Sequence, residues 1–324
     1  MYRFAHISDI HLGPLPQLTL RELFSKRITG FINWHRNRRK HLLVNTLDLL
    51  LSDIRSHHPD HLMITGDLVN LATDIEIRLA GEWLESVGEP LATTVVPGNH
   101  DAYVLGAHDK SVKRWYPFIA GDNSPKEWPD DDHVFPTYRR RGPIAIIGCS
   151  TSLATPPFSA TGFFSSRQAR ETVELLKKAG DEGLFRVVMI HHPPIRGAAA
   201  RHKRMIGIRR FNAAMSMGGA ELILHGHTHL DTVYFLKTHS GGQIPVVGIA
   251  SASQGPGGHK PRAAYNLFTL TGEPGSWNLM CERHGLTEAA DAIQLDHTRL
   301  FYGHDPRQTT VLPVSDAIPL TSPS

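Results

Sequence analysis

The feature that most constrains the fold is a series of apolar runs, each of which ends in a polar cluster. The runs and clusters are 2–7 before SDIH, 61–65 before GDLVN, 93–96 before PGNHD, 144–147 before GCSTS, 186–190 before HHPP, and 221–224 before HGHTH. Short apolar runs that stop at turn-forming residues are typical of buried strands. Helical spacing of apolar residues connects several of them, at 41–56, 75–86 and 166–179. Strands that alternate with helices predict an α/β fold.

The pattern changes after His229. Strand-like segments at 232–237, 243–249, 264–270 and 276–281 follow one another across Gly and Pro turns, and no helical pattern separates them. These strands predict a second sheet packed on the first. We interpret the basic residues 139–141 as a turn and the run 201–210 as a loop. One domain over residues 1–308 is expected, followed by a Pro-, Ser- and Thr-rich tail at 309–324 that is poorly ordered.

Composition excludes some classes of protein. The 324 residues include 34 Lys and Arg against 31 Asp and Glu, a net charge of +3, which does not favour a partner as strongly anionic as nucleic acid. The two cysteines, Cys149 and Cys281, are far apart and form no zinc motif or disulfide framework. The N-terminus reads as a strand and not as a signal peptide, and no apolar run approaches the roughly 18–20 residues that span a bilayer. We expect a cytoplasmic protein.

The polar clusters contain the side chains that bind metals. In an open α/β sheet, functional groups collect beyond the carboxyl ends of the strands, and His227 and His229, two residues apart in an extended chain, point the same way. The candidates at these ends are Asp9, His11, Asp67, Asn99, His100, His191, His227 and His229. They exceed the needs of one cation and suit two adjacent cations that share a bridging carboxylate. Each motif alone is also explained by turn chemistry. Five of them in order, each at a strand end, favour the metal site.

The ordered motifs D-I-H, G-D, G-N-H-D, H-x-P and G-H-T-H resemble those of the calcineurin-like metallophosphoesterase superfamily. Within it, the chain is similar to the bacterial class III cyclic-nucleotide phosphodiesterases and their glycerophosphodiesterase relatives. The likeness runs from Arg3 to about Ile249, and the segment STSLATPPFSATGFFSSRQARETVELL belongs to it. The resemblance implies a two-sheet β-sandwich flanked by helices, with four layers in the order αββα.

The resemblance also implies a role for each candidate. Asp9, His11 and His229 would hold the first metal, Asn99, His191 and His227 the second, and Asp67 would bridge them. His191 is chosen over His192 because the family ligand precedes one variable residue and then a proline. The metals would be two divalent or trivalent ions; the mixed His, Asp and Asn ligands suit Mn, Fe or Zn, as well as Co and Ni. His100 would contact the phosphate or protonate the leaving oxygen. Asp101 would orient His100, although many relatives carry Glu there.

This arrangement implies hydrolysis of small phosphodiesters, such as cyclic nucleotides or glycerophosphodiesters, by a metal-activated hydroxide. It requires no serine or cysteine nucleophile. Two alternatives stay open. One is a hydrolase of lipid-linked phosphoesters or pyrophosphates at a membrane surface, and the other is a nuclease or a non-catalytic metal-binding module.

Two basic segments bear on the substrate. Residues 14–41 form an insertion in which basic and apolar side chains alternate: Lys26, Arg27, Arg36, Arg38, Arg39 and Lys40 among Phe24, Ile28, Phe31, Ile32 and Trp34. It is either a helix packed on the fold, a lid, or an arm whose residues 26–41 contact an anionic membrane peripherally. The second segment, 201–210, follows HHPP. It is either a solvated loop or a site that binds a distal phosphate or carboxylate of the substrate, and it leads us to name Arg196 and Arg201, with Asn99 and His100, as substrate contacts. No nucleic-acid partner is expected, and a homodimer stays open.

Overall fold

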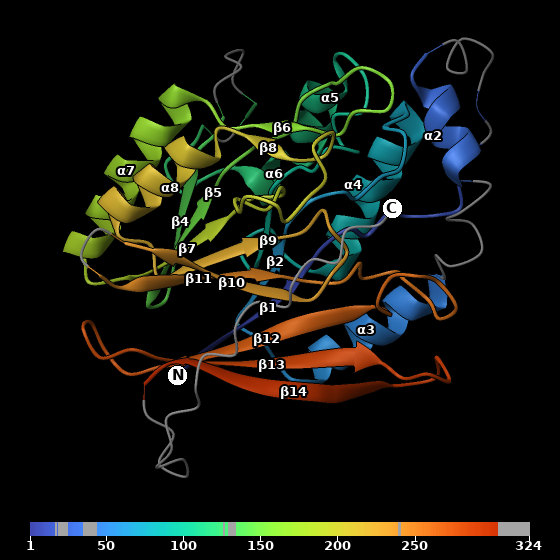
Figure 1. The fold of residues 1–324 in the computed structure, drawn as a ribbon. Helices are drawn as coiled ribbons and strands as arrows, with labels where there is room; N and C mark the ends of the chain where they lie inside the picture. The colour runs from blue at the N-terminus through green and yellow to red at the C-terminus, as the bar shows by residue number, and fades with distance from the viewer. Residues whose placement is uncertain are drawn as a thin grey trace.

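The computed structural model describes residues 1–16, 18, 25–34, 44–125, 127–128, 134–238 and 241–303. Within these residues two six-stranded sheets lie face to face, with helices on their outer sides (Figure 1). The Arg36, Arg38, Arg39 and Lys40 cluster, Phe24 and the tail at 309–324 lie outside the described residues. No helix in the described part of the chain is long and apolar enough to cross a membrane.

The first sheet contains β1 (Tyr2–Ile7), β2 (His61–Ile64), β3 (Thr93–Val95), β12 (Ala264–Thr271), β13 (Asn278–Leu286) and β14 (Ile293–Tyr302). The second contains β4 (Thr137–Arg141), β5 (Ile144–Gly148), β7 (Phe185–Met189), β9 (Leu222–His225), β10 (Thr232–Lys237) and β11 (Gln243–Gly248). Two short strands, β6 (Gly162–Phe163) and β8 (Met205–Ile206), pair with each other. The helices are α2 (Arg27–Asn33), α3 (Val44–Ser56), α4 (Asp74–Val87), α5 (Ala107–Arg114), α6 (Tyr116–Ile119), α7 (Ser166–Asp181) and α8 (Ile208–Gly218).

Strand order explains where functional side chains can gather. The first sheet has the order β14-β13-β12-β1-β2-β3, and the second has the order β10-β11-β9-β7-β5-β4. Strands β1, β2 and β3 are mutually parallel, as are β5, β7, β9 and β11. Their carboxyl ends therefore lie at one edge of each sheet, and the polar clusters follow these ends.

The strands at the centre of the second sheet are buried on both faces, which is why they read as continuous apolar runs. Val187 and Met189 join a core that includes Phe4 and Phe268 of the first sheet. The intervening Val188 belongs to a separate core with apolar residues of α7 and α8. On the other side of the molecule α3 contacts β12 and β14. The layers are therefore helices, sheet, sheet and helices (Figure 1).

Two helices begin with side-chain caps that also shape the loops before them. At α4, the Thr73 hydroxyl accepts a hydrogen bond from Glu76 N, and the Glu76 carboxylate accepts one from Thr73 N, which is a capping box. At α7, Ser165 caps Gln168 N. The Gln168 side chain then bonds both backbone groups of Ser150, so it fixes the end of β5.

The structure corrects the expected second sheet. The strands after His229 are divided: β10 and β11 extend the second sheet, whereas β12, β13 and β14 extend the first. The division arises because β12 pairs antiparallel with β1, far away in the chain. Strand β13 continues to Leu286, beyond the predicted end at 281, and β14 was not predicted.

Both basic runs also differ from their interpretation. Residues 139–141 lie in β4 and not in a turn. The guanidinium of Arg139 is buried and donates to the carbonyl oxygens of Pro90, Thr93, Pro117 and Ala120, contacts that explain a charged residue in a strand. The run 201–210 is a loop only at its start, since it continues into β8 and α8. Cys149 and Cys281 are buried free thiols.

Candidate metal centre

The seven predicted ligands come together at the carboxyl ends of the strands, in the loops after β1, β2, β3, β7 and β9. Five of them have positive backbone φ angles: Asp9 (54°), His11 (46°), Asp67 (56°), His227 (71°) and His229 (54°). Left-handed backbone is unfavourable for residues other than glycine and persists where surrounding structure imposes it, most often at functional sites. These positions need both the tight turn and the side chain.

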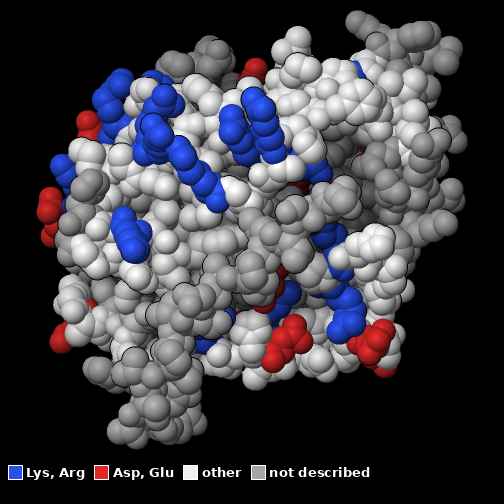
Figure 2. Space-filling view, in the orientation of Figure 1, with Lys and Arg blue, Asp and Glu red and all other residues white. Residues whose placement is uncertain are grey.

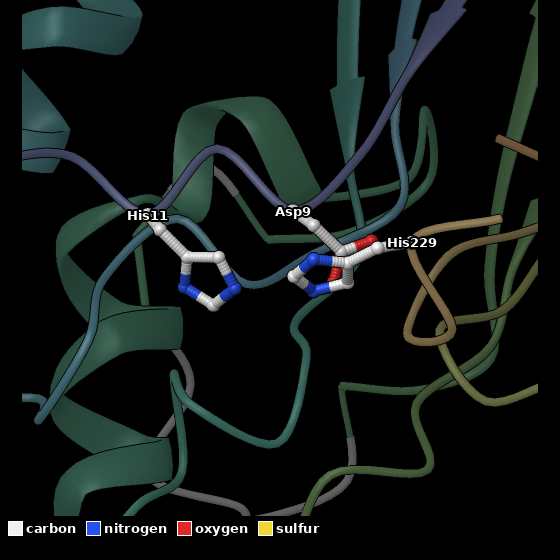
Figure 3. A group of neighbouring side chains, drawn as sticks. All are labelled: Asp9, His11 and His229. Atoms are coloured by element: carbon white, nitrogen blue, oxygen red, sulfur yellow. The ribbon is translucent and has the colours of Figure 1, made fainter. Parts of the chain in front are cut away.

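The first group contains Asp9, His11 and His229, and a metal-binding atom of each lies within 4.8 Å of the others. His229 Nε2 is 3.1 Å from Asp9 Oδ1, and the His11 and His229 rings are 5.3 Å apart. Figure 3 shows that Asp9 and His11 leave the same N-terminal segment and that the His229 ring comes from a distant segment to lie beside the Asp9 carboxylate.

The second group contains Asn99, His191 and His227. Asn99 Oδ1 is 3.2 Å from His191 Nε2 and 2.8 Å from His227 Nδ1. Asp67 lies between the two groups, because its Oδ2 is 3.4 Å from His191 Nε2 and 3.8 Å from His11 Nε2. A single carboxylate therefore reaches both groups, as a bridging ligand must.

Backbone carbonyls fix the protonation of three imidazoles. His11 Nδ1 lies 3.1 Å from Val69 O, His191 Nδ1 2.6 Å from Thr65 O, and His227 Nε2 2.8 Å from Lys203 O. A carbonyl oxygen only accepts, so each of these nitrogens carries a proton. The other ring nitrogen of His11 and of His227 turns its lone pair toward the cluster, and that of His191 does so once it has lost the second proton that the nearby carboxylates favour. Metal-binding histidines are held in this way.

Several neighbouring atoms of the cluster are hydrogen-bond acceptors that face each other without a proton between them, an arrangement that a cation would satisfy. The buried Asp9 Oδ1 accepts no hydrogen bond, although His229 Nε2 is near. The Asn99 oxygen and the unprotonated His227 Nδ1 likewise face each other as two acceptors. Nitrogen and oxygen ligands bind Zn²⁺ or similar ions at about 2.0–2.2 Å, which puts neighbouring ligand atoms about 3 Å apart. The observed spacing is of this order.

The pKa values of the clustered side chains also favour a bound cation. Burial raises the pKa of Asp67, but the imidazoles of His191, His100 and His11 lower it by more, so the pKa lies well below its usual value. Burial lowers the pKa of His191, but Asp67 and Asp9 outweigh it and raise this pKa to about 9. Burial and the neighbouring His192 and His191 keep the pKa of His227 well below its usual value. A cation entering here would displace the proton of His191.

His100 lies beside the cluster and is held from several sides. Its backbone N–H donates to Asp67 Oδ1 at 2.7 Å, and its Nδ1 lies 2.5 Å from Asn70 O. The ring stacks on Tyr103 with a centroid distance of 5.3 Å and meets the edge of His11 at 4.9 Å. A ring nitrogen of His100 lies within 4.8 Å of the metal-binding atoms of His11 and Asp67.

Asp101 does not take the expected place against the His100 ring. Its carboxylate accepts hydrogen bonds from the amides of Asp67, Leu68, Val69 and Gly98. Burial, followed by the Asp67 charge, raises its pKa to about 7. Asp101 thus joins the loops after β2 and β3, and the carbonyl oxygen of Asn70 accepts the hydrogen bond of the His100 ring. Asn70 had no predicted role. The nearby sequence signal is the capping box T-D-I-E, whose Glu76 also accepts a hydrogen bond from Asn70 N.

A cleft of about 840 Å³ opens over the ligands. One wall comes from the insertion and its neighbours, with Lys26, Gly30, Trp34, Tyr103 and Phe158. The other comes from His202, Lys203 and residues 257–260, which include His259 and Lys260. Asp67 is the one carboxylate among the described residues that line it. The cleft suits an anionic ligand.

Arg196 and Arg201, the predicted substrate contacts, are exposed and are absent from the described lining of the cleft. Lys203 and Lys260 line the cleft. Figure 2 shows that Lys and Arg side chains instead gather over the α7 and α8 part of the face in view.

The insertion packs against the fold through α2. Lys26 Nζ donates to Thr155 Oγ1 and Ser159 O and lies 4.6 Å from the Tyr103 ring centre. Arg27 donates to the carbonyl oxygens of Leu71 and Ala72. The described part of the insertion is therefore both a packed helix and a wall of the cleft.

Comparison with known proteins agrees with this geometry. A family model described as calcineurin-like phosphoesterase matches residues 2–231. A dimetal phosphatase from Danio rerio has a similar structure, with a TM-score of 0.56, 12% identity, and coverage of 91% of this chain and 98% of that chain. Purple acid phosphatase PPD1 from yellow lupin, Lupinus luteus, gives a TM-score of 0.56, 12% identity, and coverage of 97% and 57%. The predicted two-sheet fold flanked by helices is confirmed. Among curated protein sequences there is no significant match.

Proposed function

Because the chain belongs to the calcineurin-like phosphoesterase family, and is thus a metal-dependent phosphoric ester hydrolase, we propose that it hydrolyses small phosphodiesters at a two-metal centre. Asp9, His11 and His229 would hold one cation and Asn99, His191 and His227 the other. Asp67 would bridge them. The cations, whose identity the donor atoms leave open among Mn, Fe and Zn, would supply a nucleophile from water and neutralise phosphate charge.

The observation that carries the choice of a diester is that the cleft has walls on two sides of the ligands. The wall with α2 and Tyr103 stands beside His100, because Tyr103 stacks on that ring. The wall with Lys203 and Lys260 stands beside His227, because Lys203 O accepts from His227 Nε2. A diester has a substituent on either side of phosphorus, and each substituent would occupy one side of this cleft.

His100 supports the leaving of one substituent. Its Nδ1–H is committed to Asn70 O, so the ring cannot rotate without losing that bond, and His100 lines the cleft. From this position Nε2 would hold the proton that the departing alkoxide takes, and general acid catalysis of this kind contributes about 10²–10⁴-fold. The chain needs no covalent nucleophile.

The test is hydrolysis of bis(p-nitrophenyl) phosphate and p-nitrophenyl phosphate by metal-stripped protein titrated with Mn²⁺. We expect metal-dependent turnover that is faster on the diester. Turnover that favours the monoester would contradict the proposal, as would turnover that ignores the metal.

Two variants separate the roles. Asp67→Ala should lose both metal content and turnover, because it removes the carboxylate shared by the two groups. His100→Ala should keep both metals and lose about 10²-fold or more in rate. Asp109→Ala, which removes an exposed carboxylate of α5, serves as the control and should keep both metal content and turnover. A metal-free His100→Ala protein would show that His100 is a ligand.

A second candidate, action on lipid-linked phosphoesters at a membrane, is favoured by one observation. Ile28 and Ile32 lie one turn apart on α2 and are 46% and 44% exposed, beside the cleft. Apolar side chains of a basic insertion that face solvent suit peripheral contact with an anionic bilayer.

Co-sedimentation with vesicles tests this alternative. The double variant with Ile28→Ser and Ile32→Ser should lose binding to vesicles that contain anionic lipid, whereas Ile75→Ser should not, although Ile75 on α4 is equally exposed at 46%. Equal partition of all three proteins would exclude the membrane role of α2.

A further inference from the structure

We propose that the natural substrate carries a second phosphate group, distinct from the phosphodiester that is cleaved, and that Lys203 and Lys260 bind it. The inference rests on the proposed function and specifies its substrate. It concerns the cleft wall opposite α2, where two lysines from separate segments meet beside the metal ligands.

Both lysines are attached to the HGHTH loop that carries His227 and His229. The carbonyl oxygen of Lys203 accepts the hydrogen bond of His227 Nε2 at 2.8 Å. Lys260 Nζ donates to Thr228 O, the residue between the two histidines, also at 2.8 Å. One backbone contact and one side-chain contact thus hold the two residues at the same rim of the metal centre, and both line the cleft.

The two ammonium groups are close enough to repel each other. Burial lowers the pKa of Lys260, and the next cause of the lowering is the charge of Lys203. In the described part of the chain neither lysine forms an ion pair with a carboxylate, and Asp67 is the one carboxylate of the described lining. The buried Asp9 is the carboxylate whose charge opposes the lowering of this pKa, but it forms no ion pair with Lys260. Two adjacent cations without a carboxylate in contact form a site for an anion that arrives with the substrate.

Lys26, on the other wall, has a different role. Its Nζ donates to Thr155 Oγ1 and Ser159 O and lies over the Tyr103 ring. These contacts tie α2 to the fold. Lys260 spends one of its three donors on Thr228 O, so two remain for a ligand. The positive charge that is available to the substrate is therefore concentrated on the Lys203 and Lys260 side.

A phosphate group matches this site. Lysine binds phosphate as a point charge and donates from several directions, and charge-assisted hydrogen bonds are the stronger class. The cleft of about 840 Å³ exceeds what one phosphodiester with two small groups requires. The expected substrate class is a soluble diester in which one alcohol bears a further phosphate.

The experiment compares two chromogenic substrates that differ only in this group, thymidine 5′-(p-nitrophenyl phosphate) with and without a 3′-phosphate. The measured quantity is the ratio of their kcat/KM values at fixed Mn²⁺ concentration. We expect wild type to prefer the 3′-phosphorylated ester by about tenfold or more, mainly through KM, because charge-assisted hydrogen bonds to the second phosphate stabilise the bound substrate. Tenfold corresponds to about 1.4 kcal/mol.

The variants Lys203→Gln and Lys260→Gln should each reduce this ratio, and the double variant should bring it to about one. Lys203→Arg with Lys260→Arg should restore the preference, because it keeps both charges. The exposed Lys177 of α7 provides Lys177→Gln as a control that keeps the wild-type ratio. A role of Lys260 in holding the loop alone would lower the rates on both substrates and leave their ratio unchanged, which would overturn the inference.

The outcomes also separate this inference from the proposed function. If both esters are hydrolysed with metal and at equal efficiency, the phosphodiesterase stands and the second phosphate site is wrong. If neither ester nor bis(p-nitrophenyl) phosphate is hydrolysed with both metals bound, the proposed function is wrong and the second phosphate site fails with it.

Discussion

The close approach of two ligand loops at Gly226 leads to a quantitative prediction. A Cβ atom at this position would lie 2.6 Å from Asp9 Oδ2 and 2.9 Å from Ser8 Cβ, and closer still to Ser8 Oγ. Asp9 Oδ2 already accepts a hydrogen bond from His227 N at 2.9 Å. In Gly226→Ala the loops must therefore separate by roughly 1 Å, whereas metal sites tolerate about 0.2 Å in ligand distance.

We expect Gly226→Ala to cost about 1–3 kcal/mol in the free energy of unfolding, the usual range for overpacking, and to remain folded. Its metal content should fall from two ions toward one or none, and turnover should drop about 10²-fold or more. Elemental analysis after gel filtration, urea unfolding and diester hydrolysis measure the three effects.

A matched pair sharpens the test. Ser8→Ala removes the hydroxyl that the new methyl group meets first, so adding it to Gly226→Ala should recover part of the metal content, a coupling that independent sites would not show. Gly13→Ala is the control, since nothing lies within 4 Å of a Cβ there. A Gly226→Ala protein with two metals and wild-type stability would refute the reasoning.

Three further predictions concern stability and the cleft wall. Burial lowers the pKa of His61 from 6.5 to about 3, so the neutral side chain stabilises the folded protein fully above pH 6.5, and this contribution is lost as the pH falls toward 3. At about 1.4 kcal/mol per pH unit, metal-free protein should lose roughly 2 kcal/mol in the free energy of unfolding between pH 6.5 and 5 through this group. His61→Gln should flatten that pH dependence in urea unfolding. Asp101→Ala leaves four amides without their acceptor and should cost at least about 4 kcal/mol, with a loss under about 1 kcal/mol counting against its role in joining the loops. Arg27→Met removes two bonds that hold α2, so hydrogen exchange at residues 25–34 should accelerate while global stability stays within about 1 kcal/mol; unchanged exchange would show that other contacts fix α2.

Local pattern predicted the strands and helices whose burial is regular. The runs that became β5, β7 and β9 are apolar because both of their faces are covered, and the helix over 166–179 has the spacing that α7 shows. The partition of the later strands was not predictable, since nothing in 264–270 states that its partner is β1. The basic strand β4 escaped recognition because Arg139 is satisfied by carbonyl groups of two distant segments, 90–93 and 117–120.

The grouping of the candidate ligands was predictable because each of them follows the end of a strand, and their role as ligands stays a prediction. The roles of the residues around them were less predictable. Asp101 does not hold the His100 ring, because four backbone amides engage its carboxylate, and Asn70, which had no predicted role, holds the ring instead. The lysines at 203 and 260 were invisible as a pair, since only the folded HGHTH loop brings them together. The alternatives for the basic residues 36–40 remain predictions.

The position of β1 between β12 and β2 has a consequence for how the protein is made. Every candidate ligand lies between residues 9 and 229, yet the strand that precedes Asp9 obtains its second neighbour only from residues 264–271. At about 5–20 residues per second, the ribosome delivers that neighbour roughly 10–50 s after β1. During this interval one edge of an apolar strand lacks a partner. A chain arrested after the HGHTH loop would thus contain the whole ligand set on an open sheet, and we expect it to require a chaperone.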